Sequence, residues 1–262
     1  MRSFPALLLL VVLACPSLAH AAIRLENRVR PDNAETRRFI TRLEDVLAQT
    51  EKRIREVFGF RLDMKAVVNQ SRLNSDFLFS PPEHTEDAKQ SGVLLINSRV
   101  VRDWPIVDLK IAAGRALYQA VWPKFRKATA SPRLMVQQMY EEGMTAYAAE
   151  LLYPGAPKWK YAGLYGSNGA EQYRQYLAIE KDLAAEALQA LSGNATDRTS
   201  RLFPGHGSAL PLRPAPGRLL SYRLMKTFEK DMDPKMIQLM QIDEFEKRLP
   251  AGLDVLKQGI SE

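Results

Sequence analysis

The sequence predicts an α+β fold, with one helix and a few strands near the N-terminus and mostly helices after them. Short apolar runs at Phe60–Val68 and Gly92–Val101 are typical of strands. A long amphipathic segment precedes them, and several segments with helical spacing follow. Segregation of strands and helices along the chain favours α+β over a regular alternation of the two.

The first predicted helix covers Asn33–Phe58. Phe39, Leu43 and Leu47 recur at helical spacing, and charged residues occupy the other positions. Gly59 is a typical residue just beyond a helix end. Residues 69–90 are mostly polar and contain two adjacent prolines, so we expect a loop there.

Helices dominate the sequence from Ile106 onward. One is predicted from Ile106 to Trp122 and a second from Ser131-Pro132, an N-cap and first-turn signal, to about Tyr153. Residues 192–217 are rich in Gly, Pro, Ser and Arg and are expected to form a long loop. The other predicted helices are Gln172–Leu191, Leu219–Lys230, Pro234–Met240 and Asp243–Leu249.

Residues 1–21 have the features of a secretory signal peptide. Arg2 gives a positive start, Ala6–Ala14 is an apolar run, and Ala19-His20-Ala21 offers a cleavage site before Ala22. The apolar run is shorter than the roughly 20 residues that a membrane-spanning helix needs. We therefore expect an exported protein, periplasmic or secreted, with one domain over residues 22–262. Within it, an α/β lobe would cover about 22–125 and a helical lobe about 130–262.

Cys15 leaves a second interpretation of the N-terminus open. Val12-Leu13-Ala14-Cys15 is similar to a lipobox, in which the cysteine is lipidated and becomes the new N-terminus. Cys15 is the only cysteine, so the chain has no internal disulfide under either interpretation. A membrane contact is predicted only through this lipid anchor.

The charge pattern does not favour nucleic acid as a partner. The formal net charge is +7, and loss of Arg2 with the signal lowers it to +6. The excess is spread along the chain, whereas a nucleic-acid-binding protein usually concentrates it in a stripe. We expect a solvated, mildly basic surface.

Two helical segments resemble a family of predicted zinc-dependent proteases of the gluzincin type. The first contains Arg115-Ala116-Leu117-Tyr118-Gln119 where that family has H-E-x-x-H. The second contains Tyr140-Glu141-Glu142-Gly143-Met144-Thr145-Ala146-Tyr147, similar to the family's E-G-x-A-x-Y element, and continues to Leu152-Tyr153-Pro154-Gly155. Pro216–Arg223 resembles the family's C-terminal helix. The resemblance implies a zincin-like fold with a small mixed sheet and two long helices of the active-site type.

The residues that the chemistry requires are replaced. Arg115 and Gln119 stand in the positions of the two histidine ligands, and Ala116 stands in that of the catalytic glutamate. Only Glu142 remains, in the position of the third zinc ligand. Arginine has no lone pair for a metal, and a neutral amide is a poor zinc ligand. We therefore predict no cofactor, although the family implies zinc, and no confident catalytic residue.

Glu142 is expected to need a partner other than zinc. It shares a helical face with apolar residues, among them Met139 and Ala146, so its carboxylate should point inward. An unpaired buried charge is costly. We predict that Arg115 pairs with Glu142, with Gln119 adding a hydrogen bond; the other interpretation is that both charges extend to solvent.

Other candidate sites carry less weight. The chain has three histidines; His20 lies in the signal, and a two-histidine metal site from His84 and His206 has little support. Gly163, Gly166 and Gly169 are expected to form a plain turn, because no strand precedes them and no lysine of the phosphate-binding type follows.

The function predicted from the sequence is therefore binding. We expect a non-catalytic pseudopeptidase that holds a peptide or a cell-envelope protein, with Gly92–Asn97 as an edge strand for peptide pairing. Tyr118, Trp122, Tyr147 and Tyr222 are the predicted cleft lining. Two alternatives remain: a hydrolase that uses Glu142 with Tyr147 or Tyr222, and a structural lipoprotein tethered through Cys15.

Overall fold

The computed structural model describes residues 23–70, 76–80, 92–121, 134–192, 202–203 and 216–259. The predicted signal peptide, Cys15, Trp122 and all three histidines lie outside this part of the chain. The described strands are β1 (Ile23–Asn27), β2 (Met64–Asn69), β3 (Phe77–Ser80) and β4 (Val93–Asn97). The described helices are α1 (Ala34–Phe58), α2 (Ser98–Val101), α3 (Ile106–Val121), α4 (Leu134–Leu152), α5 (Lys158–Tyr161), α6 (Gly169–Ala178), α7 (Glu180–Ser192), α9 (Pro216–Phe228), α10 (Pro234–Leu239) and α11 (Ile242–Gln258).

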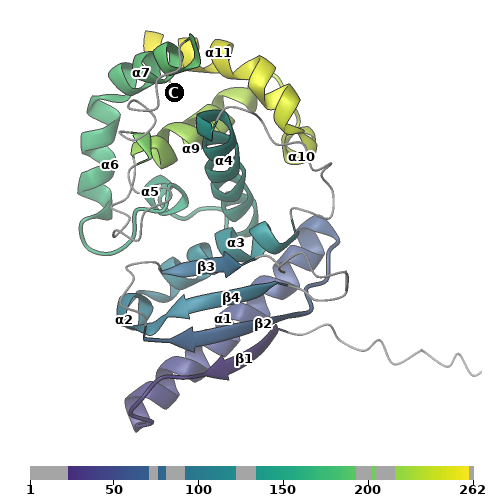
Figure 1. Cartoon of the computed structure of the whole chain (residues 1–262), viewed down its shortest axis with the longest axis vertical. Coiled ribbons are helices and arrows are strands. Elements are labelled where there is room, and N and C mark those ends of the chain that lie inside the picture. The colour runs from purple at the N-terminus through teal and green to yellow at the C-terminus, as the bar shows by residue number, and fades with distance from the viewer. Residues whose placement is uncertain are drawn as a thin grey trace, which may run out of the picture.

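The fold is mixed α+β, as predicted, with a small four-stranded mixed sheet and mostly helices (Figure 1). The strand order is β1-β2-β4-β3; β1, β2 and β4 are parallel, and β3 runs antiparallel to β4. Figure 1 shows β3 as the strand nearest to the helical half. The sheet edge that faces the helices is therefore β3.

The core on the sheet side joins α1 and α3 to the sheet. Buried residues of α1, among them Leu43 and Ile54, pack in one cluster with Ala66 of β2, Leu94 of β4 and Leu117 of α3. Asn33 caps α1 by accepting a hydrogen bond from the Thr36 amide, and Gly59 ends it with φ 75°. Gly59 thus ends α1 as predicted, whereas Asn33, predicted as the first residue of the helix, is its N-cap.

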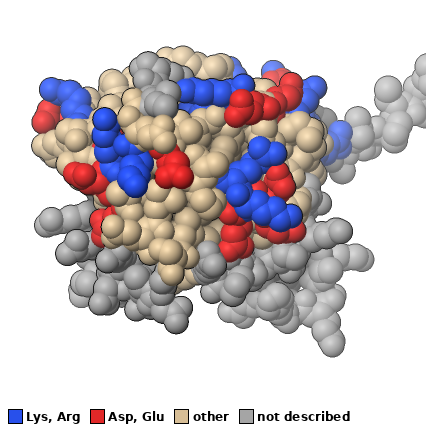
Figure 2. All heavy atoms as spheres, turned by 90° about the horizontal axis from the view of Figure 1, so that it is seen from above, with Lys and Arg blue, Asp and Glu red and all other residues tan. Residues whose placement is uncertain are grey.

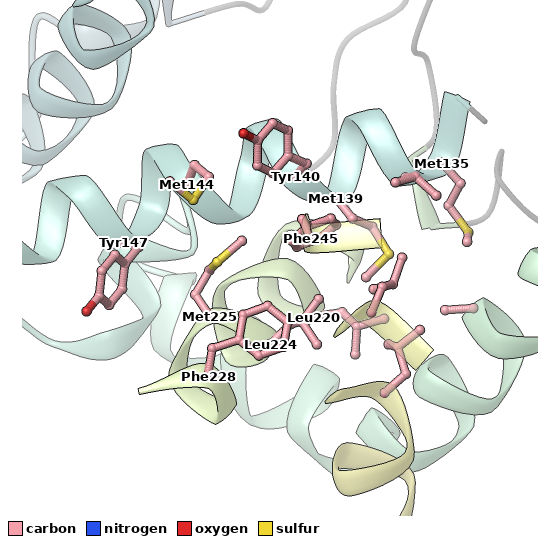
Figure 3. Packing of buried hydrophobic residues seen from close by; sticks show 14 of the residues in the cluster. Met135, Met139, Tyr140, Met144, Tyr147, Leu220, Leu224, Met225, Phe228 and Phe245 are labelled. Carbon is pink, nitrogen blue, oxygen red and sulfur yellow. The ribbon is translucent and has the colours of Figure 1, made fainter. Parts of the chain in front are cut away.

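A second core lies in the helical half. It is formed mainly by α4, α7, α9 and α11, and methionines and aromatic rings contribute much of its volume. Figure 3 shows Met139 and Tyr147 of α4 on the side that faces Leu224 and Met225 of α9. Gly143 suits this close approach, because a Cβ there would lie 3.0 Å from the Ser221 carbonyl oxygen of α9 and 2.6 Å from the Met225 Cε.

Several boundaries differ from the sequence-based predictions. β1 and α5 were not predicted, and β3 falls inside the segment predicted as a loop. The predicted strand 92–101 ends at Asn97, whose side chain accepts a hydrogen bond from the Arg99 amide and caps α2. The single helix predicted at 172–191 is two helices that meet at Ile179. α11 continues to Gln258 through Pro250.

The predicted edge strand is the most consequential correction. β4 pairs with β2 on one side and with β3 on the other, so Gly92–Asn97 is not an edge. The four-residue β3, hidden in a polar segment, takes that place.

None of the described helices is both long and apolar enough to cross a membrane. On the face shown in Figure 2, Lys and Arg side chains are interspersed with Asp and Glu. This mixture on the visible face agrees with the expected solvated surface.

Candidate functional site

The predicted ion pair between the two motif helices is present. Arg115 of α3 donates from Nη2 to Oε2 of Glu142 on α4 at 2.5 Å. The two side chains are 11% and 16% exposed, so the pair is largely shielded from solvent. A charge-assisted hydrogen bond of this kind is stronger than a neutral one, and burial reduces its screening by salt.

A second arginine, which the sequence analysis did not single out, shares the same carboxylate. Arg218 of α9 donates from Nε to Glu142 Oε1 at 3.2 Å. The negative charge of Glu142 is the main reason that the pKa of Arg218 lies above its ordinary value. The two oxygens of Glu142 are thus divided between α3 and α9.

The turn after α5 completes the surroundings of this pair. Arg115 Nη1 donates to the Tyr161 carbonyl oxygen. Asp108, on the first turn of α3 and fully buried, pairs with Lys160 Nζ and accepts a hydrogen bond from the Gly166 amide at 3.3 Å. Two side chains of α3 therefore hold residues 160–166 at both ends.

Two of the three glycines predicted to form a turn here do so, whereas Gly169 begins α6. Gly163 and Gly166 have φ angles of 77° and 78°, in the left-handed region that favours glycine. A Cβ on Gly163 would lie 3.4 Å from Arg218 Nη1 and 3.6 Å from Arg115 Cζ. The turn backbone therefore lies directly against both guanidinium groups.

Tyr165 contributes an unpaired polar group to the same place. Its ring packs on Trp104 with centroids 4.7 Å apart, and its hydroxyl is buried without a hydrogen-bond partner. Burial is the main cause that raises the pKa of Tyr165, and the charges of Arg115, Asp76, Arg218 and Asp108 also act on this group. At neutral pH the hydroxyl is a free donor.

The other motif positions show no catalytic arrangement. Ala116 is 5% exposed and belongs to the sheet-side core. Gln119 is half-buried, but it makes no hydrogen bond to Glu142, so that part of the prediction is wrong. Gln138, one turn before Glu142 on α4, is 2% exposed, and neither polar atom of its amide has a partner.

The predicted cleft lining needs correction for three tyrosines. Tyr118, Tyr147 and Tyr222 are 0%, 1% and 0% exposed and belong to the hydrophobic clusters, so they do not line an open cleft. Large aromatic rings on helices that pack on several sides are buried by their neighbours. The fourth residue, Trp122, lies outside the described residues.

The hydroxyl groups of Tyr147 and Tyr222 bind other carboxylates than that of Glu142. The Tyr147 hydroxyl donates to Glu229 at 2.8 Å, and the Tyr222 hydroxyl donates to Glu150 at 3.2 Å. Lys226 pairs with both of these carboxylates. Both hydroxyl groups are therefore bound to carboxylates other than the Glu142 that the hydrolase alternative requires.

Among the described residues, no group of three His, Cys, Asp or Glu side chains is placed to hold a metal ion. His84 and His206 lie outside that part of the chain, so the two-histidine site stays untested.

The sequence did contain a signal for the residues that were missed. Asp108, Arg218 and Arg223 are charges in helices whose other residues are largely apolar, and each has a buried or nearly buried side chain. Such charges need partners of opposite sign. Arg223, for example, pairs with the buried Glu180 at 2.9 Å. The pattern indicates that partners exist without identifying them, because they lie far away in the chain.

In comparisons with protein-family models, with curated proteins and with solved structures, the chain matched none. The residues of the site therefore carry the functional argument by themselves.

Proposed function

We propose that this protein is an exported, non-catalytic relative of zincin-type peptidases that binds peptides. The observation that carries the proposal is the buried pair between Arg115 and Glu142. Both residues occupy positions where the resemblance to the gluzincin-type family implies zinc ligands. The guanidinium of Arg115 supplies the positive charge that a metal ion would otherwise supply to Glu142.

The arrangement of elements supports this proposal. A mixed sheet ends in the antiparallel edge strand β3, and α3, which carries Arg115, packs beside that strand. α4, which carries Glu142, packs on α3. An edge strand beside a helix pair offers a peptide backbone unpaired N–H and C=O groups.

The side chains at the pair support a role in binding rather than peptide hydrolysis of the gluzincin type. An arginine cannot ligate a metal, and the methyl group of Ala116 cannot accept a proton from water. Glu142 is engaged by two arginines, one on each of its oxygens. We therefore expect the purified protein to carry no stoichiometric zinc and to show no chelator-sensitive peptide cleavage.

Restoring the histidines tests whether the pair stands at a former metal position. In the triple variant Arg115→His, Ala116→Glu, Gln119→His, the arginine no longer occupies Glu142 Oε2, and Arg218 remains to orient the carboxylate. We expect this variant to bind one zinc ion, measured by elemental analysis after dialysis. Cobalt substitution should give the visible absorption of a tetrahedral site.

Two controls separate a rebuilt site from adventitious binding. Lys52→His with Glu56→His places two histidines four residues apart on an exposed face of α1, without a third ligand. This pair should bind zinc much more weakly. Adding Glu142→Gln to the triple variant should lower its zinc affinity at least about tenfold. A folded triple variant that takes up no more zinc than the α1 control would refute the assigned metal position.

A further inference from the structure

Arg218 has donor groups that find no acceptor among the described residues. Its Nε binds Glu142, whereas its two terminal amino groups make no hydrogen bond in the described part of the chain. The side chain is 22% exposed, so part of it reaches solvent. Arg115 differs, because both of its terminal nitrogens have acceptors. A guanidinium with free parallel N–H groups suits a carboxylate in particular.

The Tyr165 hydroxyl is a second unused donor in the same place. It is buried without a partner, and Arg218 and Arg115 are among the charges that act on it. Buried polar groups in native proteins rarely lack a partner, and an exception calls for a water molecule, an ion or a ligand. On the side of the turn, Gly163 presents only backbone to Arg218 Nη1, because it has no side chain.

The charges around these donors are balanced. Asp76, Asp108 and Glu142 face Arg115, Lys160 and Arg218. Asp76 accepts a hydrogen bond from the amide of Phe77 at 2.7 Å, and Asp108 is occupied by Lys160 and Gly166. An anion is therefore selected here by direct hydrogen bonds to the free donors rather than by an excess of positive charge.

The direction of β3 indicates which end of a peptide would reach the donors. Asp76 immediately precedes β3, and its carbonyl oxygen accepts a hydrogen bond from the amide of Asn97, the cap of α2, at 2.9 Å. Trp104, just beyond α2, packs on the ring of Tyr165, so β3 begins near Tyr165. The charge of Asp76 also acts on Tyr165 and Arg218. β3 pairs only with β4 among the described strands. A peptide added antiparallel to the other edge ends, at its C-terminus, beside the start of β3. A parallel peptide would instead bring its N-terminal ammonium toward the arginines.

We propose that Arg218 and Tyr165 form a pocket for the C-terminal carboxylate of an extended peptide that pairs antiparallel with β3. The inference rests on the proposed peptide-binding function, and it adds the chemical group that the site recognises and the direction in which the peptide lies. Arg218 donates to the carboxylate through its terminal amino groups, and Tyr165 donates through its hydroxyl.

The test compares two pools of fluorescein-labelled, randomised octapeptides that differ only at the C-terminus. One pool ends in a free carboxylate and the other in a carboxamide. Binding to protein purified after expression of the whole chain is followed by fluorescence anisotropy. We expect the carboxylate pool to bind at least about tenfold more tightly, since one charge-assisted contact accounts for that difference.

Two variants test whether Arg218 and Tyr165 bind the peptide carboxylate. Arg218→Gln should remove most of the preference, and Glu142 keeps its pair with Arg115 in that variant. Tyr165→Phe should lower the affinity for the carboxylate pool severalfold and leave the carboxamide pool unchanged. It should not lower the melting temperature, because the hydroxyl has no partner in the protein. Arg24→Gln on β1 makes the same charge change at the opposite sheet edge and should leave both pools unaffected.

Each outcome bears on one of the two proposals. Equal affinity for the two pools would overturn the carboxylate pocket and leave peptide binding intact. A carboxylate preference that survives both Arg218→Gln and Tyr165→Phe would also overturn it. Binding of neither pool at concentrations up to about 1 mM, the weakest range of specific association, would instead refute the proposed function.

Discussion

At the scale of single residues, Glu142 is the side chain on which the site depends most. One oxygen binds Arg115 of α3 and the other binds Arg218 of α9, so one carboxylate is paired with positive charges on two helices. Either arginine can be lost with Glu142 still paired, whereas loss of Glu142 leaves two partly buried cations near each other. Removing one member of a buried ion pair is costly because the remaining charge stays desolvated.

Glu142→Ala should therefore lower the free energy of unfolding by about 3 kcal/mol, near the lower end of the range for buried pairs. The lower end applies because the Glu142 side chain is 16% exposed. The urea midpoint, followed by circular dichroism, measures the change. Glu141→Ala is the matched control: Glu141 precedes Glu142 on the same helix, accepts one hydrogen bond from Gln137, and should cost less than about 1 kcal/mol. Similar losses for the two variants would contradict the importance given to the pair.

At the scale of elements, the contact between β3 and β4 depends on one glycine. A Cβ on Gly92 would lie 2.4 Å from the Ser80 carbonyl oxygen and 2.6 Å from the Phe79 ring. Backbone atoms cannot move aside as the end of a flexible side chain can, so the edge strand itself would have to shift.

Gly92→Ala should destabilise the protein by about 1–3 kcal/mol, the usual cost of overpacking. Gly114→Ala, in the interior of α3, is the control. Its Cβ would meet only side chains, the nearest at 3.3 Å, and alanine favours a helix over glycine by up to about 1 kcal/mol. The control should be neutral or slightly stabilising in thermal unfolding. A loss of stability in Gly114→Ala as large as in Gly92→Ala would show that the β3 contact is not the cause.

The sequence was most informative where a signal is local. Asn33 and Gly59 fix both ends of α1 through hydrogen bonds within a few residues. The pair of Arg115 and Glu142 could be predicted because an inward-facing carboxylate needs a cation and the resemblance supplied its position. β3 could not be predicted, since four residues in a polar segment carry little periodicity. Nor could Arg218, which lies 76 residues from Glu142 and meets it only through the packing of α9 on α4.

At the scale of the whole molecule, buried tyrosines should control the response to alkaline pH. Burial is the main cause that raises the pKa of five of the nine tyrosines, namely Tyr147, Tyr153, Tyr161, Tyr165 and Tyr222. In the unfolded chain these groups ionise near pH 10. Because the folded state keeps its protons to higher pH, their contribution to stability is complete below about pH 10 and falls as the pH rises above it.

A spectrophotometric titration at about 295 nm, where tyrosinate absorbs, should therefore show delayed ionisation of part of the tyrosine in the folded protein. In urea at the same pH, all nine tyrosines should ionise near pH 10. The urea midpoint should decrease between pH 9.5 and pH 11, a range set by the unfolded pKa of about 10. A native titration curve that coincides with the curve in urea would show that these hydroxyls are not buried in solution.

The attachment of residues 160–166 to α3 has a consequence for how the molecule assembles. Asp108 and Arg115, two helical turns apart, hold this segment through Lys160, Gly166 and the Tyr161 carbonyl. A turn with two glycines in the left-handed region has little preferred shape of its own, so it takes its shape from a helix about fifty residues earlier. A fragment that begins at Leu134 could form helices, but it would lack the Asp108 and Arg115 contacts that hold this turn. The proposed carboxylate site therefore depends on the folded whole chain, and we expect neither half to bind by itself.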